Sequence, residues 1–178
     1  MNKIYFLTTI TAIIISILSL VYTHLTRPKL AYVRSQELIY GYTGTIEARK
    51  EFDEKKEKWQ ANADTLRAEF RRSLDIYNKQ SNAMSEPENK KRQKALAEQE
   101  RQLMNYENAI NNKIKEEDQL MMQGILNQIN SFIEEYGKKN NYDILLGTTV
   151  SGSLLYGRKG IDVTQDLLEK LNENYNGK

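Results

Sequence analysis

The sequence predicts an α+β protein that is mostly α-helical, with a long antiparallel helical hairpin inserted into a small β-rich head. Three observations support this fold class. Apolar residues are unevenly distributed, because much of the isoleucine lies in the first 23 residues and roughly a hundred residues in the middle are charged and helix-favouring. Within that middle, apolar residues recur every seven positions, as in coiled coils. Short strand-like runs precede and follow it, which places the head at both ends of the hairpin.

The composition excludes several classes of function. The 178 residues hold 26 basic and 24 acidic side chains, a balance that argues against a nucleic-acid partner. The chain has no cysteine, so disulfides, thiolate metal sites and a cysteine nucleophile are excluded. His24 is the only histidine, which rules out a histidine-based triad or a multi-histidine metal site. No glycine-rich phosphate loop is present. We therefore expect no enzyme activity, no metal site and no cofactor.

Residues 1–28 predict a signal peptide or a signal-anchor helix. Residues 4–23 carry no charge over 20 positions, enough for a helix to cross a bilayer. Lys3 precedes them, so the amino end is expected to stay in the cytoplasm and the rest of the chain to be exported. No small-residue cleavage pattern follows, which favours an uncleaved anchor over a cleaved signal peptide.

The first part of the head follows this segment. Residues 29–34 are rich in β-favouring side chains and predict a strand. Ser35 is a plausible N-cap for a short helix over residues 36–40, and the glycines at 41 and 44 end that helix.

Residues 44–139 predict the hairpin, which we call the arm. The apolar positions of its first helix are spaced by seven in two series: Phe52, Trp59 and Leu66, then Ala63, Phe70 and Tyr77. The pattern fails near residues 81–88, where Ser85 can cap a second helix, so we expect the tip there. It resumes with Leu96, Leu103 and Ile110, and shifts by four places after Ile114. Two helices of roughly 40 and 50 residues joined by one turn should pack antiparallel.

The second part of the head comes after the arm. The returning chain should bring residues 142–146 beside the strand at 30–33, and residues 153–156 predict a third strand after a turn at 147–152. Thr164 is expected to cap a last helix, whose apolar side carries Val163, Leu167, Leu168 and Leu171. The head thus comprises residues 29–43 and 140–178. Because so small a core is marginal, we expect a homo-oligomer joined through the head.

Taken in order, these segments resemble the Skp (OmpH-like) family of periplasmic chaperones. The resemblance covers Lys29 to Leu171 and includes a Lys-Leu-Ala-Tyr-Val-Arg strand, the long hairpin, and Tyr-Asp-Ile-Leu-Leu and Ser-Leu-Leu-Tyr strands. Its most specific part is Ile161-Asp162-Val163-Thr164 at the start of the last helix. The helices of the arm alone would match any coiled coil.

The resemblance implies a homotrimer with a β-rich head and three helical arms that enclose a cavity. Such a protein is an ATP-independent holdase in the periplasm that binds unfolded outer-membrane proteins and prevents their aggregation. Family arms are often strongly basic, whereas residues 44–139 hold 18 basic and 18 acidic side chains. An uncleaved anchor would tether this chain to the inner membrane. A membrane-tethered coiled-coil scaffold of the cell envelope is the alternative function.

A holdase needs weak, distributed contacts on a flexible wall rather than a shaped pocket. The candidate client-binding residues are the large apolar side chains of the arm: Trp59, Phe70, Tyr77, Leu103, Met104 and Tyr106. Taken singly, each could equally pack one arm helix on the other. Basic residues near the tip could steer acidic clients, or could simply form a solvated helix face: Arg71, Arg72, Lys79, Lys90, Lys91, Arg92 and Lys94.

Overall fold

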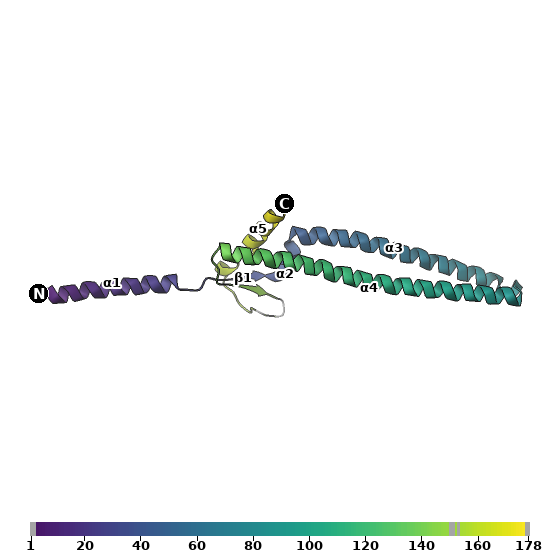
Figure 1. Ribbon diagram of the computed structural model, residues 1–178, viewed down its shortest axis with the longest axis horizontal. Helices are drawn as coiled ribbons and strands as arrows, with labels where there is room; N and C mark the ends of the chain where they lie inside the picture. The colour runs from purple at the N-terminus through teal and green to yellow at the C-terminus, as the bar shows by residue number, and fades with distance from the viewer. Residues whose placement is uncertain (1–2, 150–151, 153, 177–178) are drawn as a thin grey trace. The chain divides into compact units, whose positions relative to one another are not determined.

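A computed structural model of the chain describes residues 3–149, 152 and 154–176, with the side chains of residues 3–7, 24 and 25 excepted (Figure 1). The described residues are mostly helical, with a small sheet. In chain order the elements are α1 Lys3–Leu25, β1 Leu30–Arg34, α2 Ser35–Gly41, α3 Thr43–Gln80, η1 Ser81–Ala83, α4 Glu86–Lys139, β2 Ile144–Thr148, η2 Lys159–Ile161 and α5 Thr164–Asn176. The predicted class, α+β and mostly α, is confirmed.

The chain divides into two compact units. The first comprises residues 1–38 and 131–170, and the second comprises residues 39–130 and 171–178. The first unit contains the sheet, and the second contains most of both long helices. The boundaries that we set from the sequence for head and arm stay predictions.

The sheet of the first unit joins the two ends of the hairpin, as predicted. β1 and β2 are parallel, in a register that runs from Leu30 opposite Ile144 to Arg34 opposite Thr148. Parallel neighbours cannot be joined by a tight turn, so the connection between them must be long. Here the connection is α2, α3 and α4, so the whole hairpin is inserted in the chain after β1 and before β2 (Figure 1).

The predicted third strand at residues 153–156 is wrong for the part of it that the structure describes. Residues 154–156 are not in a strand, and Ser153 lies outside the described residues. Instead Asp162 forms an isolated parallel bridge with Tyr32, and the Val163 amide donates to the Tyr32 carbonyl at 3.1 Å. Residues 162 and 163 therefore occupy the outer edge of β1. The other edge of the sheet belongs to β2, and residues 154–156 form no strand beside it either.

Alternation along β1 builds the core of the first unit. Ala31 and Val33 are buried on one face of the strand, while Leu30 and Arg34 are exposed. Leu38 of α2 and Leu167 of α5 are also buried. The predicted apolar side of the last helix is therefore confirmed at Leu167, and Leu171 is buried as well.

The start of α5 differs from the prediction that Thr164 caps it. The Asp162 carboxylate accepts hydrogen bonds from the Thr164 amide at 3.0 Å and from the Thr164 hydroxyl at 2.5 Å. The same hydroxyl accepts a hydrogen bond from the Arg34 amide at 2.9 Å. Asp162 therefore performs the capping role, and the fully buried Thr164 ties α5 to β1.

The predicted amino-terminal helix forms as α1, and its described side chains at residues 8–23 are exposed. However, none of the helices within the described residues is both long enough and apolar enough to traverse a bilayer. The side chains of residues 4–7 lie outside the described part of this segment, so the signal peptide or anchor that we expected at residues 1–28 stays a prediction.

In the second unit, α3 and α4 run antiparallel and side by side (Figure 1). They contain 38 and 54 residues. The turn between them is η1, close to the predicted tip, and Ser85 precedes α4, where Glu88 supplies the acidic half of a capping box. The Ser85 hydroxyl donates to Glu88 at 2.9 Å, while the Ser85 amide donates to the same carboxylate at 3.3 Å.

Candidate functional site

The two arm helices are joined by scattered polar and aromatic contacts rather than by a continuous apolar core. Arg67 of α3 donates to Glu107 of α4 at 3.1 Å, and the Lys113 ammonium lies 4.8 Å from the centre of the Trp59 ring. Nearer the tip, the Tyr77 hydroxyl donates to Asn89 at 2.7 Å. Ala63 is the one buried apolar residue of α3 within the described part of the chain. A pair of helices held in this way leaves much of its apolar surface available.

The structure separates the six candidate client-binding residues into two groups. Trp59, Phe70, Tyr77, Leu103 and Tyr106 are half-buried. Trp59 and Tyr77 contact the opposite helix, which matches the alternative that they pack the arm. Met104 differs from them, since it is 51% exposed on α4.

Sequence reasoning missed several exposed apolar residues of the second unit, because they lie off the positions spaced by seven. These additional exposed residues are Ile46, Leu74, Ile76 and Leu120. Leu66, which we placed on the packed stripe, is also exposed. Apolar residues that do not fit the seven-residue spacing could have predicted most of these exposed positions.

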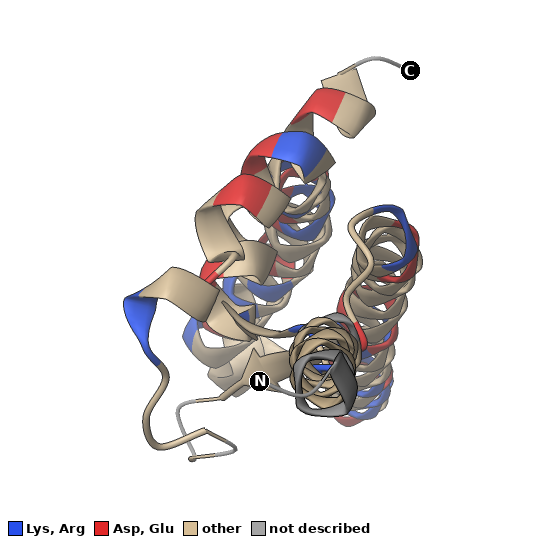
Figure 2. Cartoon of the chain, turned by 90° about the vertical axis from the view of Figure 1, so that its left-hand side faces the viewer, with Lys and Arg blue, Asp and Glu red and all other residues tan. Residues whose placement is uncertain are grey.

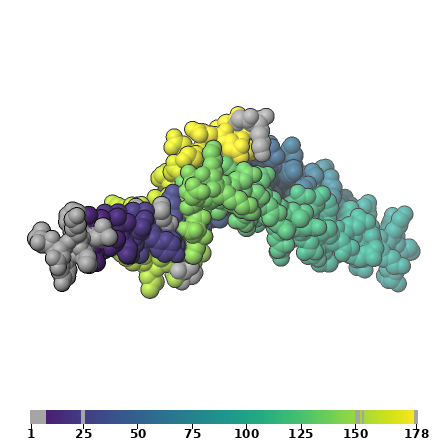
Figure 3. Space-filling view, turned by 60° about the vertical axis from the view of Figure 1, so that its left-hand side comes forward, coloured from purple at the N-terminus to yellow at the C-terminus, as the bar shows by residue number. Residues whose placement is uncertain are grey.

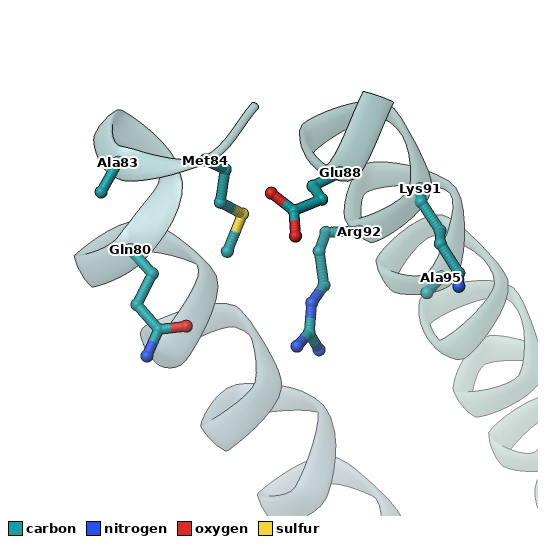
Figure 4. Close-up of a pocket in the computed structure, with 7 residues that line it drawn as sticks. All are labelled: Gln80, Ala83, Met84, Glu88, Lys91, Arg92 and Ala95. Carbon is teal, nitrogen blue, oxygen red and sulfur yellow. The ribbon is translucent and has the colours of Figure 1, made fainter. Parts of the chain in front are cut away.

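A groove lies between the two helices at the tip, with a volume of about 660 Å³. Figure 4 shows the side chains of Met84, Glu88 and Arg92 in the space between the helices. A smaller hollow of about 100 Å³ shares Met84, Arg92 and Ala95 with it, and adds the apolar side chains of Ile76 and Leu96. The tip groove therefore combines an apolar lining with charged groups.

The charge in the tip groove is mainly positive. Lys91 and Arg92 line it, and Glu88 is the one carboxylate among its lining residues. That carboxylate already serves the start of α4: hydrogen bonds from the Ser85 hydroxyl and amide lower the pKa of Glu88. The groove therefore carries two cations and one ionised carboxylate, and its lining has a net positive charge.

The other basic residues predicted at the tip are exposed but do not line this groove: Arg71, Arg72, Lys79, Lys90 and Lys94. Lys79 pairs with Asp75 at 2.7 Å and Lys90 pairs with Glu86 at 3.2 Å. Figure 2 shows basic and acidic residues interspersed along the helices. The charged residues of the arm therefore do not form one large patch of a single sign. For Lys79 and Lys90 the solvated-face interpretation fits better.

A second groove, of about 240 Å³, lies between the first turns of α3 and residues 120–128 of α4, with Tyr175 of α5 beside it. Tyr175 donates a hydrogen bond to Glu47 at 2.6 Å and packs edge-on against Tyr42. This hydrogen bond raises the pKa of Tyr175, and the nearby charge of Glu51 adds to the shift. The Tyr42 hydroxyl in turn donates to Gln128 at 3.0 Å.

In the first unit, α5 lies beside α4 (Figure 3), and polar contacts connect them. The Tyr136 hydroxyl donates to Asp166, and Lys170 donates to the same carboxylate at 2.7 Å. These two hydrogen bonds lower the pKa of Asp166. Within the residues that the structure covers, no group of three or more His, Cys, Asp or Glu side chains could hold a metal ion.

Comparison with known proteins places the chain in a family. A family model described as "Outer membrane protein (OmpH-like)" matches residues 29–171. A solved structure from Caulobacter crescentus CB15, of a protein proposed to be an outer membrane chaperone (OmpH-like), is similar in fold, with a TM-score of 0.63 at 12% identity. The similarity covers 84% of this chain and 86% of that one. No curated protein matches the sequence significantly.

Proposed function

Because the chain belongs to the OmpH-like family, we propose that it is an ATP-independent holdase chaperone that binds unfolded outer-membrane proteins and prevents their aggregation. Family membership supports a chaperone role in general. The holdase mechanism and the class of client are our proposal, and they depend on the surface of the arm.

The observation that carries this proposal is the number of large apolar side chains that α3 and α4 leave exposed: Ile46, Leu66, Leu74, Ile76, Met104 and Leu120. They are scattered among charged residues rather than gathered in one pocket, and both grooves are open to solvent. Many weak contacts can cover different unfolded sequences without selecting one of them. The two cations of the tip groove would add attraction for acidic client segments.

We further propose that the protein works as a homotrimer in the periplasm. In support, Leu155 is 94% exposed and Tyr156 is 84% exposed, beside a sheet whose Ile144 and Leu146 are also exposed. Apolar surface of this kind is typical of a protein–protein interface. Sedimentation equilibrium of the full chain tests the assembly, and a monomer at micromolar concentration would contradict it.

The holdase proposal is tested by the aggregation of an unfolded outer-membrane β-barrel protein on dilution from denaturant, followed by light scattering without ATP. We expect the full chain to suppress the scattering, and Met104→Glu to suppress it less, because the change places a charge within the exposed apolar surface. Asn105→Glu is the matched control, since Asn105 is exposed on the next position of α4. A chain that leaves the scattering unchanged would refute the proposal, as would capture of one folded partner in place of unfolded proteins.

A further inference from the structure

The second groove has an apolar side that α4 provides. Ile125 is buried there, whereas Leu120 is 58% exposed although it lines the same space. Between them lies Gly124, where an added Cβ would meet no atom within 4 Å. The absence of a side chain at Gly124 thus opens the helix surface at this turn, and apolar atoms of Leu120 stay accessible in the groove.

The opposite side of the groove is acidic. Glu47 and Glu51 lie one turn apart on α3, a spacing at which like charges repel. Glu47 accepts a hydrogen bond from Tyr175, and the charges of both carboxylates act on the same Tyr175 hydroxyl. Among the residues that the structure describes, no basic side chain forms an ion pair with either of them. No basic side chain lines the groove either.

The size of the groove limits what it can hold. Its volume of about 240 Å³ falls below the range of roughly 300–1,000 Å³ that is usual for small-molecule pockets. It suits one or two side chains of a polypeptide. A favourable occupant would bury an apolar side chain against Leu120 and Ile125 and bring a positive charge to Glu51.

We propose that this groove binds segments of unfolded polypeptide in which an apolar residue adjoins a lysine or arginine. The inference rests on the proposed holdase function for its occupant, and it adds a preference for charge to that function. Its preference is opposite to that of the tip groove, where Lys91 and Arg92 make the net charge of the lining positive. The two grooves would therefore recognise different segments of one client.

The test uses two labelled peptides that share their apolar residues, one with lysines and one with glutamates at the remaining charged positions. Binding to the full chain is measured by fluorescence anisotropy. We expect the lysine peptide to bind about fivefold more tightly, which corresponds to about 1 kcal/mol, and the preference to decrease with added salt.

Two variants test the two sides of the groove separately. Gly124→Leu fills the open space and should weaken binding of the lysine peptide about fivefold or more. The helix itself should be stabilised, because leucine has a higher helix propensity than glycine. Glu51→Lys should reverse the preference between the peptides. Glu54→Lys is the matched control, because Glu54 is exposed on α3 and does not line the groove. It should retain the wild-type preference, and circular dichroism should show that all three variants keep their helices.

Equal binding of the two peptides by the wild type would overturn the inference. So would unchanged binding of the lysine peptide by Gly124→Leu, or a loss of the preference in Glu54→Lys as large as that in Glu51→Lys. If a second copy of the chain occupied the groove, peptide binding would give one of these three contradicting results. Gly124→Leu would then change the oligomeric state measured by sedimentation. If the wild type suppresses aggregation without preferring the lysine peptide, this inference fails and the holdase proposal stands. If it prefers the lysine peptide without suppressing aggregation, the holdase proposal fails and the groove stands.

Discussion

The buried Leu167 offers the sharpest test of the first unit. It is 0% exposed on α5, and truncation to alanine removes three carbon atoms from a closed environment. At about 0.8 kcal/mol for each buried carbon, the transfer contribution is about 2.4 kcal/mol. The cavity that remains adds to this, so Leu167→Ala should destabilise the unit by about 3 kcal/mol. This is a large fraction of the stability of a small domain.

Hydrogen exchange of the β1 amides measures this loss where it occurs, whereas circular dichroism would mainly report the long helices. A loss of about 3 kcal/mol should speed exchange at residues 31–34 roughly a hundredfold. Leu74→Ala is the matched control, since Leu74 is exposed on α3 and its loss should change exchange little. If Leu167→Ala changed β1 exchange by less than about threefold, the packing of α5 in the core of the first unit would be refuted.

Three further predictions concern other contacts. Ser85→Ala removes the hydrogen bond from the Ser85 hydroxyl to the Glu88 carboxylate at the start of α4, and should lower stability by about 1 kcal/mol in urea denaturation. Ser81→Ala, whose hydroxyl makes only a 3.5 Å contact to Asn78, should cost less. Gly157→Ala should cost about 1–3 kcal/mol in thermal denaturation, because the new Cβ would overlap the Tyr32 ring, whereas Gly160→Ala meets no atom within 4 Å and should be nearly neutral; equal effects would contradict the Tyr32 contact. The pKa of Asp166 is lowered from 3.8 in the folded state, so its stabilising effect is present above that value and is lost as the pH falls through the lowered pKa. In Asp166→Asn, hydrogen exchange of the β1 amides should therefore depend less on pH in this acidic range than it does in the wild type. An unchanged pH dependence would contradict the prediction.

Much of the arm followed from local sequence, because helix formation depends on spacing that a single segment carries. Positions spaced by seven predicted α3 and α4, and the hydrogen bonds of Ser85 at the start of α4 reach Glu88, only three residues away. The candidate residues were harder to assign. Spacing identifies the side of a helix that packs, and this is why it selected Trp59 and Tyr77, which contact the other helix, and missed Leu120.

The head shows the opposite case, because its contacts join residues far apart in the chain. Nothing local to Asp162 indicates that it bridges Tyr32, although its capping contact with Thr164 is local. An apolar run such as residues 154–156 reads as a strand whether or not an edge is free to pair with it. Spacing alone could not locate the space beside Gly124 either, because a groove exists only where two helices fail to fill the distance between them.

The sequence by itself determined the helical hairpin, its turn, and the meeting of residues 30–33 with residues 142–146, since a hairpin must return the chain to where it began. The structure set the register, with residues 30–34 opposite residues 144–148. Only the tertiary structure decided which residue completes the edge of β1, which apolar side chains stay exposed, and where open grooves meet charged groups. The physical reason is that periodicity is a property of one segment, whereas burial and charge complementarity depend on which distant atoms come together.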